Sequence, residues 1–202
     1  MKTIVEFDFE KATQAINFLA QKEGGAISKL KVVKLIWLVD RRHLRKYGRP
    51  VTNDTYYAMK FGPVGSSVKD LAECSDFLGD DERAYVNRFL SCDKDANLIS
   101  SKENIDKDIL SESDIESLQE VYATFGKKSP GALVELSHVY PEWKKFEPQL
   151  KSASISRAVM SYSDFFLDPE KSVADFFHDA PERIKASKGV FEDNFQVASF
   201  WI

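Results

Sequence analysis

The stretch LKVVKLIWLVDRRHLRKYG, residues 30–48, decides the fold. Apolar side chains occupy almost every position before Asp40, and a helix that is apolar all round has to be buried. Beyond Asp40 the pattern becomes amphipathic, and Gly48 is a typical helix stop. Ser28 is a suitable N-cap. We therefore predict a central core helix that begins after Ser28 and ends at Gly48.

Amphipathic helices are predicted on both sides of this core helix. Asp8 caps a helical pattern that ends at Gly24-Gly25. Ser67 and Asp70 form a capping-box pattern for a helix that runs towards Phe77. Further helix starts are the capping box of Ser111 and Asp114, the pair Ser129-Pro130, Pro141, and Asp168-Pro169, which is followed by Val173, Phe176 and Phe177.

Two short segments favour extended structure. Residues 51–61 contain β-branched and aromatic side chains, and Gly62-Pro63 closes this segment. Between residues 85 and 100, apolar clusters flank a polar turn, which predicts a β-hairpin. The predicted fold class is thus mainly α: a compact helical domain around a buried central helix, with a small antiparallel β element.

We expect one main domain and an elaboration. Residues 1–151 form the domain, and residues 152–202 form a carboxy-terminal helical and aromatic part packed on the same unit, because no low-complexity linker or repeat divides them. The tail ends in Phe200, Trp201 and Ile202. Apolar surface is costly to leave in water, at roughly 25 cal/mol per Å². Either the protein's own core or a partner has to cover this tail.

The composition predicts a soluble, cytoplasmic protein. Of the 202 residues, 43% are hydrophobic, which suffices for a sizeable core. The first residues lack a signal-peptide pattern, and no segment approaches roughly eighteen uninterrupted apolar residues, so we expect neither secretion nor a membrane. Cys74 and Cys92 have no CxxC neighbour. They predict neither a disulfide framework nor a thiolate zinc site, which fits a reducing cytoplasm.

No catalytic, cofactor-binding or metal-binding constellation is visible. His43, His138 and His178 lack the i, i+4 pairing of a helical zinc site. Ser137 precedes His138, but adjacent helix residues point about 100° apart. The GPVGSS segment at residues 62–67 lacks the Walker lysine, and we interpret it as a rigid turn, with an anion at its amides as the alternative. The sequence does not exclude that the fold brings Cys74 or Cys92 beside a histidine. We expect a protein that is not an enzyme.

A basic cluster closes the core helix. Such a cluster can contact phosphate or an acidic protein surface, or can simply stabilise the helix carboxyl end. The net charge of −4 makes nucleic acid an unfavourable partner. A nucleic-acid-binding transcriptional regulator that uses the cluster is the second function considered, and the acidic residues between 103 and 120 are interpreted as a solvated face. The cluster consists of Arg41, Arg42, Arg45, Lys46 and Arg49.

Four motifs follow one another in the first third of the chain. They are KLIWL at residues 34–38, the acidic Asp40, YGRP at residues 47–50 and YYAMKFGPV at residues 56–64. With these motifs the chain resembles the Panacea family, also called the SocA-like antitoxin domain. Residues 110–138 and the following Pro141-Glu142-Trp143 resemble the second half of that family, so the resemblance covers residues 9–147. Ile36-Trp37 stands where family versions commonly carry an aromatic pair.

The resemblance implies the antitoxin of a two-gene toxin–antitoxin pair, or a member of related phage-conflict systems. Members neutralise chemically unrelated toxins by direct protein contact. The implied partner is a cognate toxin, inhibited by occlusion or delivered to a protease system. We expect contacts at residues 56–64 and the nearby core helix, with the tail as a second contact; the alternative is that the aromatic residues only pack on the core helix. The expected contact residues are Asp40, Arg41, Tyr56, Tyr57, Lys60, Phe61, Gly62, Pro63, Val64, Phe200 and Trp201.

Overall fold

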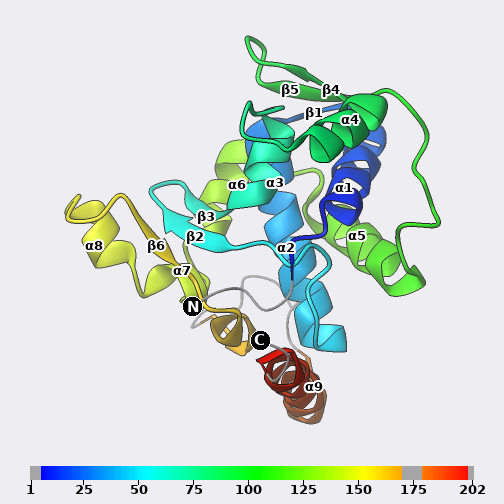
Figure 1. The fold of residues 1–202 in the computed structure, drawn as a ribbon. Helices are drawn as coiled ribbons and strands as arrows, with labels where there is room; N and C mark the ends of the chain where they lie inside the picture. Colours follow the sequence, from blue (N-terminus) through cyan, green and yellow to red (C-terminus); the bar gives the residue numbers. More distant parts are fainter. Residues whose placement is uncertain (1–5, 170–178, 200–202) are drawn as a thin grey trace.

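The computed structural model describes residues 6–169 and 179–199, with side chains up to residue 194. Helix α2 (Lys29–Tyr47) runs through the middle of the molecule and the other elements surround it (Figure 1). Its ends confirm the prediction. The Ser28 side chain accepts a hydrogen bond from the Lys31 amide, and Gly48 has a φ of 72°, the left-handed conformation of a glycine C-cap.

The core is built around the apolar half of α2. Leu35, Ile36, Trp37 and Leu38 have no exposed surface. They are enclosed because helices pack on several sides of α2, as the prediction for an all-apolar helix requires. The α-helices that pack most extensively on α2 are α1 (Phe9–Lys22), α3 (Ser66–Ala72), α5 (Glu112–Phe125), α6 (Pro130–Ser137) and α9 (Pro181–Ser199).

Two small antiparallel sheets complete the fold, and the predicted class, mainly α with a small β element, is confirmed. One sheet has the order β1-β5-β4 and contains the predicted hairpin. Residues 85–89, which we expected in that hairpin, instead end helix α4 (Asp80–Phe89). The other sheet has the order β3-β2-β6. The strands are β1 (Ala26–Ser28), β2 (Tyr56–Met59), β3 (Gly62–Gly65), β4 (Leu90–Asp93), β5 (Leu98–Ser101) and β6 (Arg157–Val159).

The predicted helix caps are confirmed at all but one of the tested places. Asp8, Ser129 and the Ser111–Asp114 capping box act as expected. The capping box of Ser67 and Asp70 is wrong, because α3 begins at Ser66 and ends at Ala72, before Phe77. The carboxylate of Asp54 takes the place of a local cap and accepts hydrogen bonds from the amides of Ser67 and Val68, at 3.0 and 2.7 Å.

Residues beyond 151 contact the preceding part closely. Strand β6 pairs with β2, with Ala158 opposite Ala58. Residues 170–178 and 200–202 lie outside the described residues, and with them the predicted helix around Val173, Phe176 and Phe177 and the tail of Phe200, Trp201 and Ile202. The short elements of this region are α7 (Pro141–Lys144), α8 (Glu147–Lys151) and the 3₁₀ helix η1 (Tyr162–Phe166).

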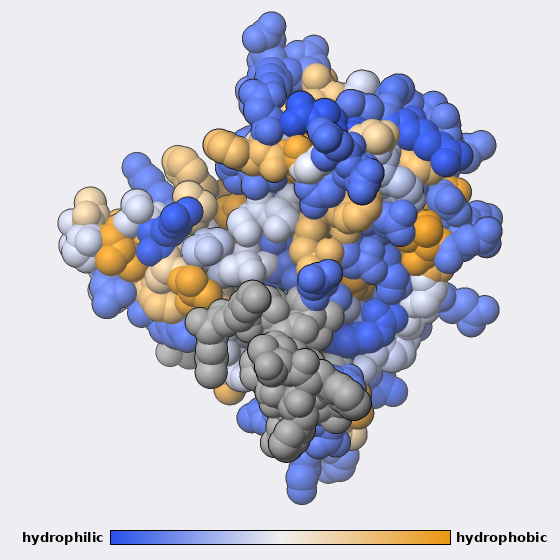
Figure 2. Space-filling model, viewed as in Figure 1, coloured by the Kyte–Doolittle hydropathy of each residue, from blue (hydrophilic) through white to orange (hydrophobic). Residues whose placement is uncertain are grey.

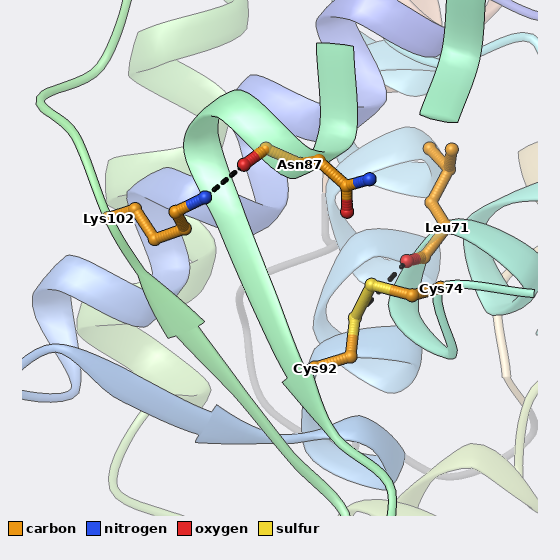
Figure 3. Close-up of a disulfide and its surroundings, with 5 residues drawn as sticks. All are labelled: Leu71, Cys74, Asn87, Cys92 and Lys102. Carbon is orange, nitrogen blue, oxygen red and sulfur yellow. Dashed lines mark hydrogen bonds between the residues drawn. A yellow bond between two sulfur atoms is a disulfide. The ribbon is translucent and has the colours of Figure 1, made fainter. Parts of the chain in front are cut away.

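Cys74 and Cys92 are joined by a disulfide between the end of α3 and strand β4 (Figure 3). Sγ of Cys92 lies 3.9 Å from the carbonyl oxygen of Leu71, and Lys102 on the chain after β5 donates to the carbonyl of Asn87. This pairing corrects the interpretation of the cysteines. Because lasting disulfides are rare where thiols are kept reduced, the two cysteines no longer support a reducing compartment.

No helix in the described ranges combines the length and the apolar character needed to cross a membrane.

Candidate protein-binding groove

An open groove of about 420 Å³ lies between the start of α2, the β2–β3 hairpin and α3. Its lining is mostly apolar, with ammonium groups around it. In Figure 2, apolar side chains interrupt the polar surface in the left half of the view, where Figure 1 places the hairpin and β6. The groove residues are Lys29, Leu30, Val33, Lys34, Met59, Lys60, Phe61, Val64, Lys69, Ala72, Glu73, Asn97 and Ser156.

The hairpin that forms one wall is fastened to the core from two sides. The buried Lys34 of α2 donates from Nζ to the carbonyl oxygen of Pro63 at 2.7 Å. Trp143 of α7 donates from Nε1 to the carbonyl oxygen of Met59 at 2.8 Å. Burial lowers the pKa of Lys34 to about 7, because a charged ammonium is poorly solvated there. The wall of the groove is therefore held in place by hydrogen bonds to its backbone.

Large apolar side chains stay exposed at the groove. Phe61, at the tip of the hairpin, exposes 61% of its surface, and Leu30, at the start of α2, exposes 42%. The ammonium of Lys60 lies 5.6 Å from the centre of the Phe61 ring. Beside the groove, the guanidinium of Arg157 lies 5.2 Å from the ring centre of Tyr57. Aromatic and arginine side chains of this kind are enriched in protein interfaces.

The expected contact residues divide into exposed and buried ones. Lys60, Phe61 and Val64 line the groove, and Tyr57 lies in the same hairpin. Gly62 and Pro63, which also belong to the hairpin, are buried. Gly62 has a φ of 90°, and a Cβ there would lie only 2.1 Å from Oγ of Ser137, so this position requires glycine. Phe200 and Trp201 lie outside the described residues.

Three further expected contact residues, Asp40, Arg41 and Tyr56, are also buried, which corrects the expectation that they form part of the surface. The Asp40 carboxylate accepts hydrogen bonds from the amides of Val51 and Thr52, from the Thr52 hydroxyl and from the hydroxyl of Tyr56. Burial raises the pKa of Asp40, and these donors oppose the rise. Asp40 thus fastens the chain after α2 to the hairpin from inside.

The basic cluster at the end of α2 is paired internally, residue by residue. Arg41 is completely buried with Glu142, and Arg45, also unexposed, lies 2.6 Å from Asp168. The remaining pairs are Arg45 with Asp179, Arg42 with Glu120 and Asp179, Lys46 with Glu116 and Glu120, and Arg49 with Asp114. Part of the acidic run is therefore a partner of α2 and not a free solvated face.

This pairing corrects the alternative function. A DNA-binding cluster has to present its cations to phosphate groups. Here Arg41 and Arg45 have no exposed surface, and carboxylates already neutralise their neighbours. The nucleic-acid-binding regulator loses the feature on which it depended.

The histidines that the structure describes have structural contacts. His43 is buried with Nδ1 2.7 Å from the carbonyl oxygen of Arg49, and Nε2 lies 3.2 Å from the Asp114 carboxylate. His138 ends α6 and its ring stacks on Trp143 at 3.8 Å. Among the described residues, no three His, Cys, Asp or Glu side chains gather in a way that could hold a metal ion.

Sequence reasoning placed the contacts at residues 56–64 and the nearby core helix, but it did not identify which side chains at the start of α2 line the groove. Leu30 was assigned to the buried helix face but exposes 42% of its surface, because an apolar pattern does not reveal which side stays uncovered. Lys34 was the residue that could have indicated the contact between α2 and the hairpin, since a lysine within an apolar helix needs a specific hydrogen-bond acceptor. That acceptor is the Pro63 carbonyl, which only the folded hairpin supplies.

Most of the groove, all but Lys29, Leu30 and Ser156, lies within a region that matches a known family. Residues 32–144, more than half of the chain, match the model described as "Antitoxin SocA-like, Panacea domain". The match is narrower than the resemblance seen over residues 9–147. Comparison with curated proteins and with solved structures gave no match. The matched range contains most of α2, the whole β2–β3 hairpin, α3 and α5 to α7. The chain therefore belongs to the SocA-like antitoxin family with a Panacea domain.

Proposed function

We propose that this protein is the antitoxin of a two-gene toxin–antitoxin pair and neutralises its toxin by direct contact at the groove. The observation that carries the proposal is that the family match spans the hairpin and α3, the elements that leave Phe61 and its neighbours exposed. The buried or paired polar residues of α2 supply the scaffold behind this surface. Binding, rather than chemistry on a substrate, is the role proposed.

The contact residues proposed are those of the hairpin that remain accessible, namely Tyr57, Lys60, Phe61 and Val64. Their backbone is fixed by Lys34 and Trp143, so little conformational entropy is lost when a partner binds. The tail residues Phe200 and Trp201 are proposed as a second contact.

Co-expression with the product of the neighbouring gene tests the proposal. We expect that product to arrest growth alone and to be harmless beside this protein. The variant Phe61→Glu should lose most of the rescue, whereas Phe77→Glu, which changes an equally large phenylalanine with 91% exposure on another loop, should keep it. A neighbouring product that is harmless alone, or that stays toxic beside this protein, contradicts the antitoxin role.

The amount of toxin distinguishes the two modes of neutralisation. If the protein occludes the toxin, rescued cells contain as much toxin as cells that express an inactive variant of the toxin without this protein. If a protease system is a further partner, the toxin level falls when this protein is present. In a protease-deficient strain the toxin level should then stay high. Immunoblots of a tagged toxin measure both.

A further inference from the structure

The groove differs in charge from the rest of the protein. Four lysines line it, but burial lowers the pKa of Lys34 to about 7, so Lys29, Lys60 and Lys69 carry most of the positive charge, against the single carboxylate of Glu73. That carboxylate is already paired with Lys69 at 2.7 Å. The chain as a whole carries a net charge of −4. Opposite charge concentrated at one place on an acidic protein attracts an acidic ligand there and not elsewhere.

The lysines at the rim are available to a partner. Within the described ranges, neither Lys29 nor Lys60 forms an ion pair. By contrast, the cations at the other end of α2 are each matched with carboxylates, as for Arg42 and Lys46. The uncompensated positive charge of α2 and the hairpin is therefore concentrated at the groove.

The apolar part of the lining favours an apolar group in the groove. We call Val33, Met59, Val64 and Ala72 its floor, and Phe61, which lines the groove with them, exposes 61% of its surface. A volume of about 420 Å³ is small for a ligand site, and suits one or two large side chains better than a whole helix. Burial of the Phe61 ring and of the inserted side chain would provide the non-directional part of the affinity.

We infer that the groove receives a short acidic segment of the partner protein, which inserts one apolar side chain between Phe61 and α2 while its carboxylates meet Lys29 and Lys60. This inference rests on the proposed function in naming the toxin as the source of that segment. A nucleic acid is disfavoured because the net charge of −4 repels a phosphate backbone and the apolar floor gains nothing from it. The positively charged rim favours a negatively charged ligand, and the apolar floor favours a ligand with one apolar side chain.

Selection from a library of short random peptides displayed on phage tests the inference without the toxin. The full chain is immobilised, and peptides that also bind Phe61→Glu are removed. We expect the enriched peptides to share Asp or Glu on either side of one Leu, Ile, Phe or Trp. Enrichment of basic or uncharged peptides, or no peptide that distinguishes Phe61→Glu from the wild-type chain, overturns the inference.

Titration of the best synthetic peptide then locates the contact. Lys60→Glu should raise Kd about tenfold or more, as for a central interface residue. The matched control Lys94→Glu changes an exposed lysine in the β4–β5 turn and should leave Kd unchanged. Equal effects of the two variants would show a general charge effect and refute the site. Tighter binding of an oligonucleotide than of the peptide refutes the acidic protein segment as the ligand.

The two proposals can fail separately. If growth rescue succeeds but the selected peptides do not require Phe61, the antitoxin role stands and the acidic segment is refuted. If the peptides bind as expected but the neighbouring product is harmless, the groove binds acidic segments in a protein that is not an antitoxin.

Discussion

Nη1 of Arg41 lies 2.9 and 2.8 Å from the two carboxylate oxygens of Glu142, and neither side chain has exposed surface. The pair connects the middle of α2 with α7 across 101 positions of sequence. Burial lowers the pKa of Arg41 and raises that of Glu142, and the attraction between the two opposes both shifts. Each charge is thus stabilised inside the protein by the other, and Arg41 also donates to the carbonyl of Leu167.

Glu142→Ala should therefore destabilise the protein strongly. The variant leaves a buried guanidinium without its carboxylate, which typically costs about 3–5 kcal/mol. The control Glu135→Ala removes an exposed carboxylate from α6 and should change the free energy of unfolding by no more than about 0.5 kcal/mol. Urea unfolding followed by circular dichroism measures both. Similar midpoints for the two variants would contradict the structural role of the pair.

Two glycine variants should change stability in opposite directions. Gly62→Ala places a Cβ 2.1 Å from Oγ of Ser137 and 2.9 Å from Nζ of Lys34, at a φ of 90°. We expect a loss of about 1–3 kcal/mol from strain and displaced contacts. Gly131→Ala, in helix α6 with no neighbour within 4 Å of the new Cβ, should gain about 0.4–1 kcal/mol. Thermal unfolding of the two proteins gives the sign of each change.

Lys34 predicts that stability rises with pH above neutrality. Its pKa is about 7 in the folded chain against the ordinary lysine value of 10.5, so between these two values the unfolded chain binds a proton that the folded chain lacks. The free energy of unfolding should then increase with pH by up to about 1.4 kcal/mol per unit in this window. The polar groups near the ammonium include the Pro63 carbonyl, which accepts its hydrogen bond, and His138.

The variant Lys34→Met isolates this contribution. Because it removes the titrating group, the difference in stability between wild type and variant should itself change with pH from about 7 to 10. Lys94→Met, which alters an exposed lysine, should run parallel to the wild type. Urea unfolding at several pH values measures the slopes. If the free energies of unfolding of the wild type and of Lys34→Met change with pH in parallel, the prediction that Lys34 is neutral in the folded chain is wrong.

Local patterns predicted the parts of the fold that depend on neighbouring residues. The apolar run before Asp40 placed α2 at the centre, and Ser28, Gly48 and Ser111 marked helix ends, because caps act over three or four positions. The cap of α3 escaped prediction for the same reason. Asp54 lies 13 positions before the Ser67 amide that it binds, and no local rule covers that separation.

The candidate site was predicted only in part. The exposure of Lys60 and Phe61 agrees with a hairpin tip rich in interface residue types. The basic cluster was misleading, because its carboxylate partners come from as far away as Asp179, which sequence spacing cannot pair with Arg42. A charge in a sequence therefore indicates a binding surface only after its internal partners are known.

Reduction of the Cys74–Cys92 disulfide should loosen the hairpin of β4 and β5 and the end of α3. The bond closes a loop with a sequence separation of 18. A loop of this length restricts the unfolded chain by about 3 kcal/mol, which corresponds to a fall in Tm of roughly 6–12 °C for a protein of this size.

Adding a reductant should therefore lower Tm, and Cys92→Ser should have the lower Tm with no further response to the reductant. Ser91→Ala, an exposed neighbour on β4, should respond as the wild type does. Because α3 supplies Lys69 and Ala72 to the groove, we also expect faster amide exchange there after reduction. A Tm that does not move when a thiol assay detects both free cysteines would show that the cross-link adds nothing to the stability of the fold.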